Sequence, residues 1–305
     1  MKKAVLTVLA VAAVLGLLSA AWFASAPRTL SPAIAEEVAA PGDAAAGRIV
    51  FFAAGCDSCH MSTEQSDPFR LGGGREIRTP FGSFYAANIS QHPRDGIGAW
   101  SPRDFAQALL VGVSPSGEHY YPAFPYTSYR HLTTTDVRDL YAFMRTLPAI
   151  AGRAPANALI FPFSIRRAIG LWKRLYSGSR PFAPAPDRDP AWRLGRYLVE
   201  GPGHCVECHS PRDLLGGVIA HRRLTGGANP GGEGRSPDIT AAGLKNWTKD
   251  QIAQALWTGL TPSGDTLGGL MATVVHNTAE LPPSYRAAIA EYLKSVAPDG
   301  PPPGG

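Results

Sequence analysis

One short pattern occurs twice in the 305-residue sequence and contains all four of its cysteines. The copies read CDSCH, from Cys56 to His60, and CVECH, from Cys205 to His209. In a C-x-x-C-H segment both thiols can add across the vinyl groups of a haem, and the histidine then supplies the proximal nitrogen of the iron. The pattern therefore predicts two covalently bound haem c groups, with thioether bonds at Cys56, Cys59, Cys205 and Cys208 and iron ligands at His60 and His209.

Paired C-x-x-C segments can instead form zinc knuckles or redox-active dithiols. A zinc site would fit a cytosolic protein better, and a histidine after each second cysteine would then be a coincidence that occurs twice. Covalent haem attachment is therefore the favoured interpretation. Because it uses all four thiols, no disulfide is expected.

The cysteine patterns lie within a longer internal repeat. GRIVFFAAGCDSCH, beginning at Gly47, is similar to GRYLVEGPGHCVECH, beginning at Gly195. Further along, WSPRDFAQALLVGVSPSGE (residues 100–118) is similar to WTKDQIAQALWTGLTPSGD (residues 247–265). The repeat predicts two domains of one design in tandem. Gly47 and Gly195 are expected where the first helix of each domain crosses the last, because glycine allows two backbones to approach closely.

Capping residues and apolar spacing predict the other helices of the repeat. Ser101 and Thr248 are suitable N-caps for a helix in each copy. Each domain is expected to close with an amphipathic helix. Its apolar stripe consists of Val137, Leu140, Tyr141 and Met144 in the first copy and of Tyr285, Ile289, Tyr292 and Leu293 in the second.

The repeat also exposes a difference at the sixth ligand position. Met271 lies in GGLMATVVHNT, which we expect to be a loop that folds over the haem face opposite His209, where a thioether suits iron that changes oxidation state. In the second part of the repeat Phe105 pairs with Ile252, an offset of 147 residues, and the same offset pairs Phe124 with Met271. Phenylalanine cannot coordinate a metal ion. His131 is the candidate replacement there. Two alternatives stay open: His131 as a solvent-facing loop residue, and a first haem without a protein ligand on this side.

Several segments resemble the cytochrome c subunits of bacterial membrane-bound alcohol and aldehyde dehydrogenases. They include TPFGSFYAANIS (79–90), GIGAWSPRDF (96–105), YPAFPYTSY (121–129) and, in the second copy, GHCVECHSPRDLLGG and GGLMATVVHNTAEL. The resemblance spans roughly residues 44 to 297. It implies an all-α fold of two tandem class I cytochrome c-like domains, each wrapped around one haem, with long irregular connections.

The resemblance also implies a function. The chain would be a periplasmic di-haem cytochrome that passes electrons from a partner dehydrogenase, or another redox protein, to a respiratory acceptor without transforming a substrate. The family tends to have methionine at the position of Phe124 or of Leu132, and this chain departs at both. The alternative is therefore a haem enzyme that acts on peroxide or a small sulfur compound at an open first haem.

The N-terminus predicts the compartment. Lys2 and Lys3 precede an uncharged apolar run from Ala4 to Ala26, which reaches the length of a membrane span. ASA at residues 24–26 resembles a cleavage site, but Pro27 would hinder a peptidase. We expect an uncleaved anchor in the inner membrane, with the rest on the periplasmic side; a cleaved signal, giving a soluble periplasmic protein, is the alternative.

The remaining composition is that of a globular protein, with 45% hydrophobic and 17% charged residues. A net charge of +5 without a basic run between aromatic residues gives no support for nucleic-acid binding. Residues 164–178, SIRRAIGLWKRLYSG, predict a basic amphipathic helix. Its favoured interpretation is a linker helix with a solvated basic face; a dock for a partner or for anionic lipid is the alternative. The expected division is 1–26 signal or anchor, 27–43 linker, 44–150 first domain, 151–188 inter-domain segment, 189–297 second domain and 298–305 disordered tail.

Overall fold

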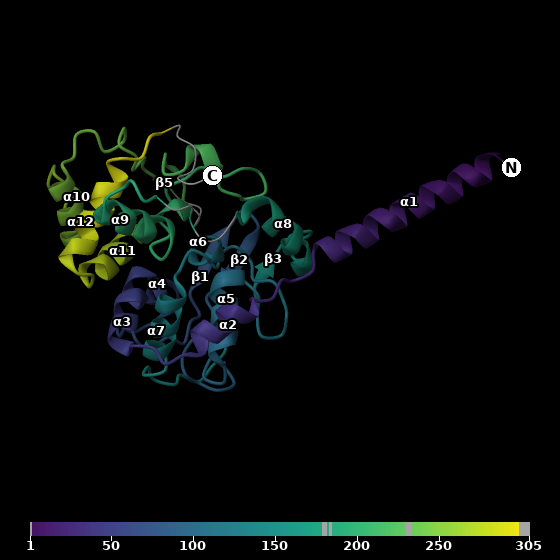
Figure 1. The fold of residues 1–305 in the computed structure, drawn as a ribbon, viewed down its shortest axis with the longest axis horizontal. Helices are drawn as coiled ribbons and strands as arrows, with labels where there is room; N and C mark the ends of the chain where they lie inside the picture. The colour runs from purple at the N-terminus through teal and green to yellow at the C-terminus, as the bar shows by residue number, and fades with distance from the viewer. Residues whose placement is uncertain (1, 179–181, 183–184, 230–233, 299–305) are drawn as a thin grey trace.

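The computed structural model describes residues 2–178, 182, 185–229 and 234–298 and shows a mostly helical body from which one long helix projects (Figure 1). The projecting helix is α1 (Lys2–Ala24). The predicted C-terminal tail lies, apart from residue 298, outside the described residues.

Each half of the body contains its own set of helices. The N-terminal half contains α2 (Pro32–Ala39), α3 (Ala44–Ala53), α4 (Cys56–His60), α5 (Pro102–Val111), α6 (Tyr126–Tyr129) and α7 (Thr134–Met144). The C-terminal half contains α9 (Pro190–Glu200), the 3-10 helices η2 (Cys205–Glu207) and η3 (Ala220–Arg222), α10 (Lys249–Thr258), α11 (Leu270–Ala279) and α12 (Pro283–Leu293). Between them lie η1 (Arg166–Ala168) and α8 (Ile169–Tyr176).

The two predicted glycine crossings are confirmed. A Cβ added to Gly47 in α3 would lie 1.9 Å from the carbonyl oxygen of Asp139 in α7. A Cβ added to Gly195 in α9 would lie 1.9 Å from the carbonyl oxygen of Ala288 in α12. Both pairs of helices therefore cross at backbone contact, which only glycine permits.

The predicted caps are confirmed as well. Ser101 begins α5 with a capping box that Asp104 completes, and Thr248 begins α10 with one that Gln251 completes. Both helices end at a glycine in the left-handed region, Gly112 with φ of 67° and Gly259 with φ of 76°. The capped helix is thus built in the same way in both copies.

Two buried clusters form the core, one in each half. The closing helices supply much of each: Val137, Leu140 and Met144 are buried in the first cluster, and Ile289, Tyr292 and Leu293 in the second. Tyr285 packs against both clusters, so the cores meet across the junction of the two halves.

The expectation of an all-α fold is too strict, because the structure also contains short strands. β1 (Glu76–Thr79) and β2 (Gly82–Tyr85) form an antiparallel hairpin, and β3 (Ala158–Leu159) pairs with β2. In the C-terminal half, β4 (Gly227–Ala228) pairs with β5 (Arg235–Ser236). The first hairpin follows from the two-residue connection Pro80–Phe81 and from Gly82, whose φ of 115° a side chain would disfavour.

The favoured interpretation of the basic segment was wrong in one respect. η1 and α8 are helical, but their basic side chains are not a solvated face. Arg167, Lys173 and Arg174 donate hydrogen bonds to main-chain carbonyls of α1 and of the end of α5. The apolar stripe is instead partly exposed, with Ile165 and Leu175 open to solvent.

Candidate haem sites

The first candidate attachment segment is the short helix α4. Gly55 precedes it with φ of 60°, so the chain turns sharply before Cys56. Nδ1 of His60 lies 2.7 Å from the carbonyl oxygen of Ala87. A carbonyl only accepts hydrogen bonds, so Nδ1 carries the proton and Nε2 keeps a lone pair for a metal ion.

The second candidate segment repeats this geometry on η2. His204 precedes it with φ of 39°, again in the left-handed region. Nδ1 of His209 lies 2.8 Å from the carbonyl oxygen of Pro237. Each proximal histidine is therefore oriented by one backbone carbonyl, as expected for an imidazole that binds iron through Nε2.

The residues fit covalent haem better than zinc. Burial lowers the pKa of both His60 and His209, which keeps the imidazoles neutral as an iron ligand requires. Burial also raises the pKa of the four thiols, so in the bare protein they stay protonated. Among the described residues, which include all four cysteines, no group of three or more His, Cys, Asp and Glu is arranged to hold a metal ion.

Each attachment segment accepts hydrogen bonds from a helix of the other half. From the N-terminal half, Thr127 Oγ1 and Ser128 Oγ in α6 donate to Glu207 Oε1 of η2, at 2.7 and 3.1 Å. From the C-terminal half, Asn277 Nδ2 in α11 donates to Ser58 Oγ of α4, at 2.8 Å. Each C-x-x-C segment is thus fixed by a helix of the other half.

The charge of Glu207 is compensated by a nearby cation. Glu207 is largely buried, and its Oε2 accepts from Arg212 at 2.6 Å. A buried carboxylate without such a partner would be costly. Nearby, the ring of Tyr129 meets that of His204 edge to face, with centroids 5.5 Å apart. Sequence reasoning singled out none of Glu207, Asn277 or Thr127 in this role, because no motif marks a contact between repeats.

Met271 and Phe124, which the repeat pairs as candidates for a sixth ligand, lie in different surroundings. Met271 is half-buried in the first turn of α11, so the expectation of a loop there was wrong; the helix begins directly after Gly269, whose φ is 58°. Phe124 packs among aromatic rings, 5.5 Å from that of Tyr120 and 5.7 Å from that of Tyr129.

Three further histidine and methionine side chains have defined surroundings. The ring of His131 is stacked on Phe182, with centroids 3.8 Å apart and planes within 8°, so it is not a solvent-facing histidine. Met144 is buried in the core, as its place in the apolar stripe predicts. His119 is buried, with Nε2 2.9 Å from the carbonyl oxygen of Ser25.

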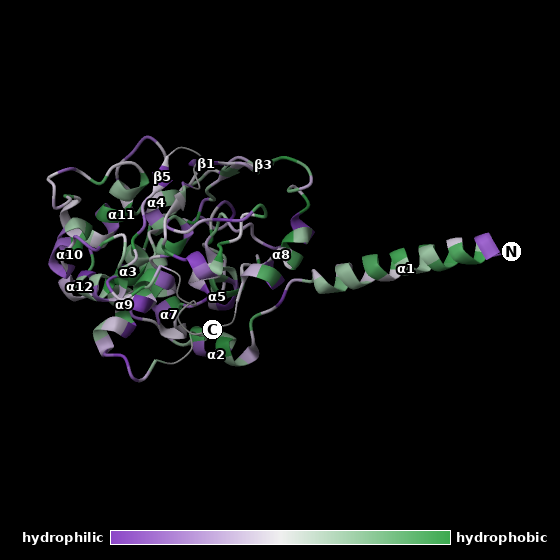
Figure 2. Ribbon diagram, turned by 90° about the horizontal axis from the view of Figure 1, so that it is seen from above, coloured by the Kyte–Doolittle hydropathy of each residue, from purple (hydrophilic) through white to green (hydrophobic). Residues whose placement is uncertain are grey.

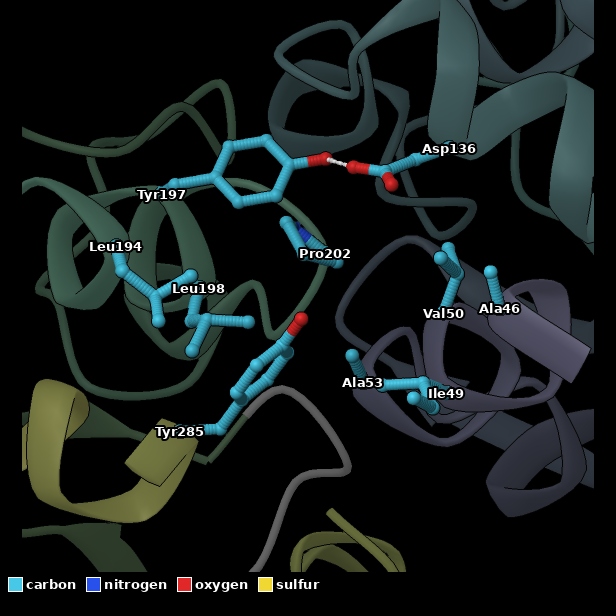
Figure 3. A pocket seen from close by; sticks show the side chains of 10 residues that line it. All are labelled: Ala46, Ile49, Val50, Ala53, Asp136, Leu194, Tyr197, Leu198, Pro202 and Tyr285. Carbon is cyan, nitrogen blue, oxygen red and sulfur yellow. Dashed lines mark hydrogen bonds between the residues drawn. The ribbon is translucent and has the colours of Figure 1, made fainter. Parts of the chain in front are cut away.

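A cavity of about 90 Å³ lies between the two halves (Figure 3). α3 lines it with Ala46, Ile49, Val50 and Ala53, and α9 with Leu194, Tyr197 and Leu198. Tyr197 donates a hydrogen bond across its rim to Asp136. Sites for small molecules are usually several times larger. This cavity is therefore a packing gap rather than a candidate active site.

Comparison with known proteins agrees with these features. Residues 44–148 match the family model of cytochrome c. The chain is 47% identical over 257 residues to a diheme cytochrome c-type protein of Cereibacter sphaeroides, covering 84% of this chain and 86% of that protein. It is 35% identical over 255 residues to the fructose dehydrogenase cytochrome subunit of Gluconobacter japonicus, and the match covers 82% of this chain and 52% of that protein. It is 34% identical over 257 residues to the cytochrome c subunit of a quinone alcohol dehydrogenase of Gluconacetobacter polyoxogenes, and the match covers 80% of this chain and 53% of that protein.

The fold and the two C-x-x-C-H segments are those of a c-type cytochrome that binds haem covalently. The chain belongs to the family of c-type cytochromes that includes the cytochrome subunits of quinone alcohol, fructose and gluconate dehydrogenases. It spans about half the length of those dehydrogenase subunits. These relatives are cytochromes and cytochrome subunits of dehydrogenases.

Proposed function

We propose that this chain carries electrons through two covalently bound haems, from a partner dehydrogenase to a respiratory acceptor, at the periplasmic face of the inner membrane. The observation that supports this most is the pair of matched attachment segments, each with a histidine oriented by a backbone carbonyl. A bound haem would supply one-electron exchange at its iron. The similarity to cytochrome subunits of dehydrogenases supports the choice of partner.

The residues of the chain would divide the binding between them. Cys56 and Cys59 would hold the first haem, and Cys205 and Cys208 the second. His60 and His209 would bind the two irons through Nε2. On the opposite side, Met271 remains the proposed ligand of the second haem and His131 the candidate for the first. His131 would have to leave its stack on Phe182 to coordinate.

The proposed domains, 44–150 and 189–297, would each surround one haem. The reciprocal contacts at Glu207 and Ser58 hold the two attachment segments in one rigid junction. A fixed junction favours electron exchange between two centres, because nothing has to move before each transfer. Electrons would therefore pass from one haem to the other within the chain, and the two haems would not act as independent carriers.

The proposed anchor is α1, a helix of 23 residues in which an uncharged, mostly apolar run follows Lys2 and Lys3; this run is exposed except at the half-buried Ala21 and Ala24. At 1.5 Å per residue it is about 35 Å long, enough to cross the hydrocarbon core of a bilayer. Lys2 and Lys3 favour a cytoplasmic N-terminus. The body that carries the haem segments would then lie in the periplasm.

Substrate-driven reduction tests the proposal. The full-length protein is purified from its native membranes together with its bound dehydrogenase, whose substrate is then added without oxygen. We expect the α-band of c-type haem to appear, with two haems per chain by pyridine haemochrome. The control is a double variant, Cys205→Ala with Cys208→Ala, which should keep one haem per chain.

Two results would contradict the proposal. One is a copurified dehydrogenase that turns over with an artificial acceptor while the haems stay oxidised. The other is rapid turnover of peroxide by the isolated chain, which would favour the enzymatic alternative.

A further inference from the structure

An exposed apolar surface lies on the inter-domain segment. It comprises Ile160, Phe161, Phe163, Ile165, Leu171 and Leu175, and we name it the apolar ridge. Phe161 is 80% exposed and Leu175 is 68% exposed. In Figure 2 the hydrophobic stretch after β3 and the helix α8 lie at the end of the body from which α1 leaves. Several large apolar side chains exposed within one short segment often mark an interaction site.

The segment that carries the ridge is attached to the end of α1. Arg167 donates to Ser25 Oγ at 3.0 Å and to the carbonyl oxygen of Trp22 at 3.1 Å. Arg174 donates to the carbonyl oxygen of Ala24. A Cβ added to Gly170 would lie 2.1 Å from the carbonyl oxygen of Ser25, so α8 touches this backbone directly. The last carbonyls of a helix need such donors, and cations are favoured there.

This attachment fixes the height of the ridge relative to a membrane that contains α1. Trp22 lies in the last turn of α1, where aromatic residues prefer the boundary between headgroups and acyl chains. The guanidinium of Arg167 lies over the Trp22 ring, 4.4 Å from its centroid. α8 is therefore held at the level of this boundary.

The charge beside the ridge suits the surface of an anionic bilayer. Arg166, Arg167 and Arg174 form no ion pair with any carboxylate among the described residues. Their partners are neutral: carbonyl and hydroxyl oxygens and, for Arg166 and Arg167, aromatic rings. The positive charge stays uncompensated next to exposed Phe and Leu side chains. This combination is typical of segments that lie in a membrane interface.

We propose that the apolar ridge is a second membrane contact, seated in the headgroup region of an anionic phospholipid bilayer beside the end of α1. It would prevent the body from swinging about its single anchor and hold it in one orientation. The position of the ridge beside α1 rests on the retained anchor of the proposed function, whereas the affinity of the ridge for an anionic bilayer does not. A membrane is favoured over a protein partner because the ridge is continuous with the end of a membrane-spanning helix.

The test uses the full-length holoprotein in vesicles of phosphatidylethanolamine and phosphatidylglycerol. Phe161→Cys and Leu175→Cys each place one new thiol on the ridge, and the four native thiols are consumed by haem attachment. Leu260→Cys is the matched control, since Leu260 is 49% exposed and follows α10, at the opposite end of the body from α1 (Figure 1). The rate of alkylation by a membrane-impermeant maleimide is measured and divided by the rate in denaturant.

We expect the two ridge thiols to react at least about tenfold more slowly than the control, because each apolar side chain that remains in the ridge favours the membrane-seated state by at least about this factor. In vesicles of phosphatidylcholine alone the protection should be weaker. Equal rates at all three positions would overturn the proposal. So would protection that appears only after the partner dehydrogenase is added, which would assign the ridge to a protein interface.

An intact mass separates this proposal from that of the retained anchor. A mature chain that begins at or after Pro27 would contradict the anchor alone. The same variants of that shorter mature protein, mixed with the same vesicles, should still show protection at 161 and 175. Their full reactivity there would overturn the ridge proposal as well.

Discussion

Replacing Gly195 by alanine tests the helix crossing that supports the second haem segment. The new Cβ would lie 1.9 Å from the carbonyl oxygen of Ala288 and 2.8 Å from Cβ of Tyr292. Ordinary contact needs about 3.4 Å, so α9 and α12 would have to separate by roughly 1.5 Å. η2, which follows α9 directly, would move with it.

The cost follows from two opposing effects. Alanine favours a helix over glycine by about 1 kcal/mol. Overpacking a closed contact costs about 1–3 kcal/mol or more, and α9 and α12 form one of the two most extensive helix pairs in the structure. A methyl group facing a backbone carbonyl belongs at the upper end of that range, because the carbonyl cannot rotate away. We expect a net destabilisation of about 2 kcal/mol.

The assay is chemical unfolding of the holoprotein followed by far-ultraviolet circular dichroism and, separately, by the haem absorbance. Arg193→Ala is the control, because it introduces the same residue on the exposed face of the same helix. Gly195→Ala should unfold at lower denaturant concentration and disturb the spectrum of one haem only. If it matches Arg193→Ala within about 0.5 kcal/mol, the crossing is not closed as the structure describes.

Four shorter predictions address the ligands, the anchor and the docking of α1. Met271→Ala should remove the absorption band at about 700 nm that is expected of His/Met ligation, and it should leave the other haem unchanged. An unaltered spectrum would refute the assignment. His131→Ala should convert one haem to high spin or open it to cyanide, unless the wild type already contains a high-spin haem. Mass spectrometry should find a chain that retains Trp22. Burial, more than the nearby cations Lys173 and Arg167, lowers the pKa of His119 below its ordinary value of about 6.5, so the folded state resists its protonation. Stability should therefore be full above about pH 6.5 and fall below it, and His119→Gln should weaken this dependence in thermal unfolding.

Local signals in the sequence were sufficient for the repeated helices. The capping residues Ser101 and Thr248 begin helices because a side-chain oxygen satisfies a free backbone donor, which depends only on neighbouring residues. The glycines at 47 and 195 were predictable because each begins the segment of the repeat that leads to a cysteine pattern. The β1–β2 hairpin was also within reach, since EIRT and GSFY flank a two-residue turn.

Contacts between the halves were not predictable in the same way. Nothing in the neighbourhood of Glu207 indicates that Thr127 will donate to it, since 80 residues separate them. The basic segment was misread for a related reason. Its pattern shows that Arg167 and Arg174 occupy one side of a helix, but not that the carbonyls at the end of α1 lie opposite them. Charge alone does not distinguish a solvated face from one that caps another helix.

The junction also explains how the first half can have Phe124 where the second has Met271. The segment after each of these residues makes a contact with the other half. After Met271, α11 reaches Ser58 through Asn277. After Phe124, α6 reaches Glu207 through Thr127. The crossing contact does not depend on the ligand, so a ring that packs against Tyr120 and Tyr129 can keep the first segment in place. The repeat can therefore differ at the two positions proposed for a sixth ligand while each C-x-x-C segment stays bound to a helix of the other half.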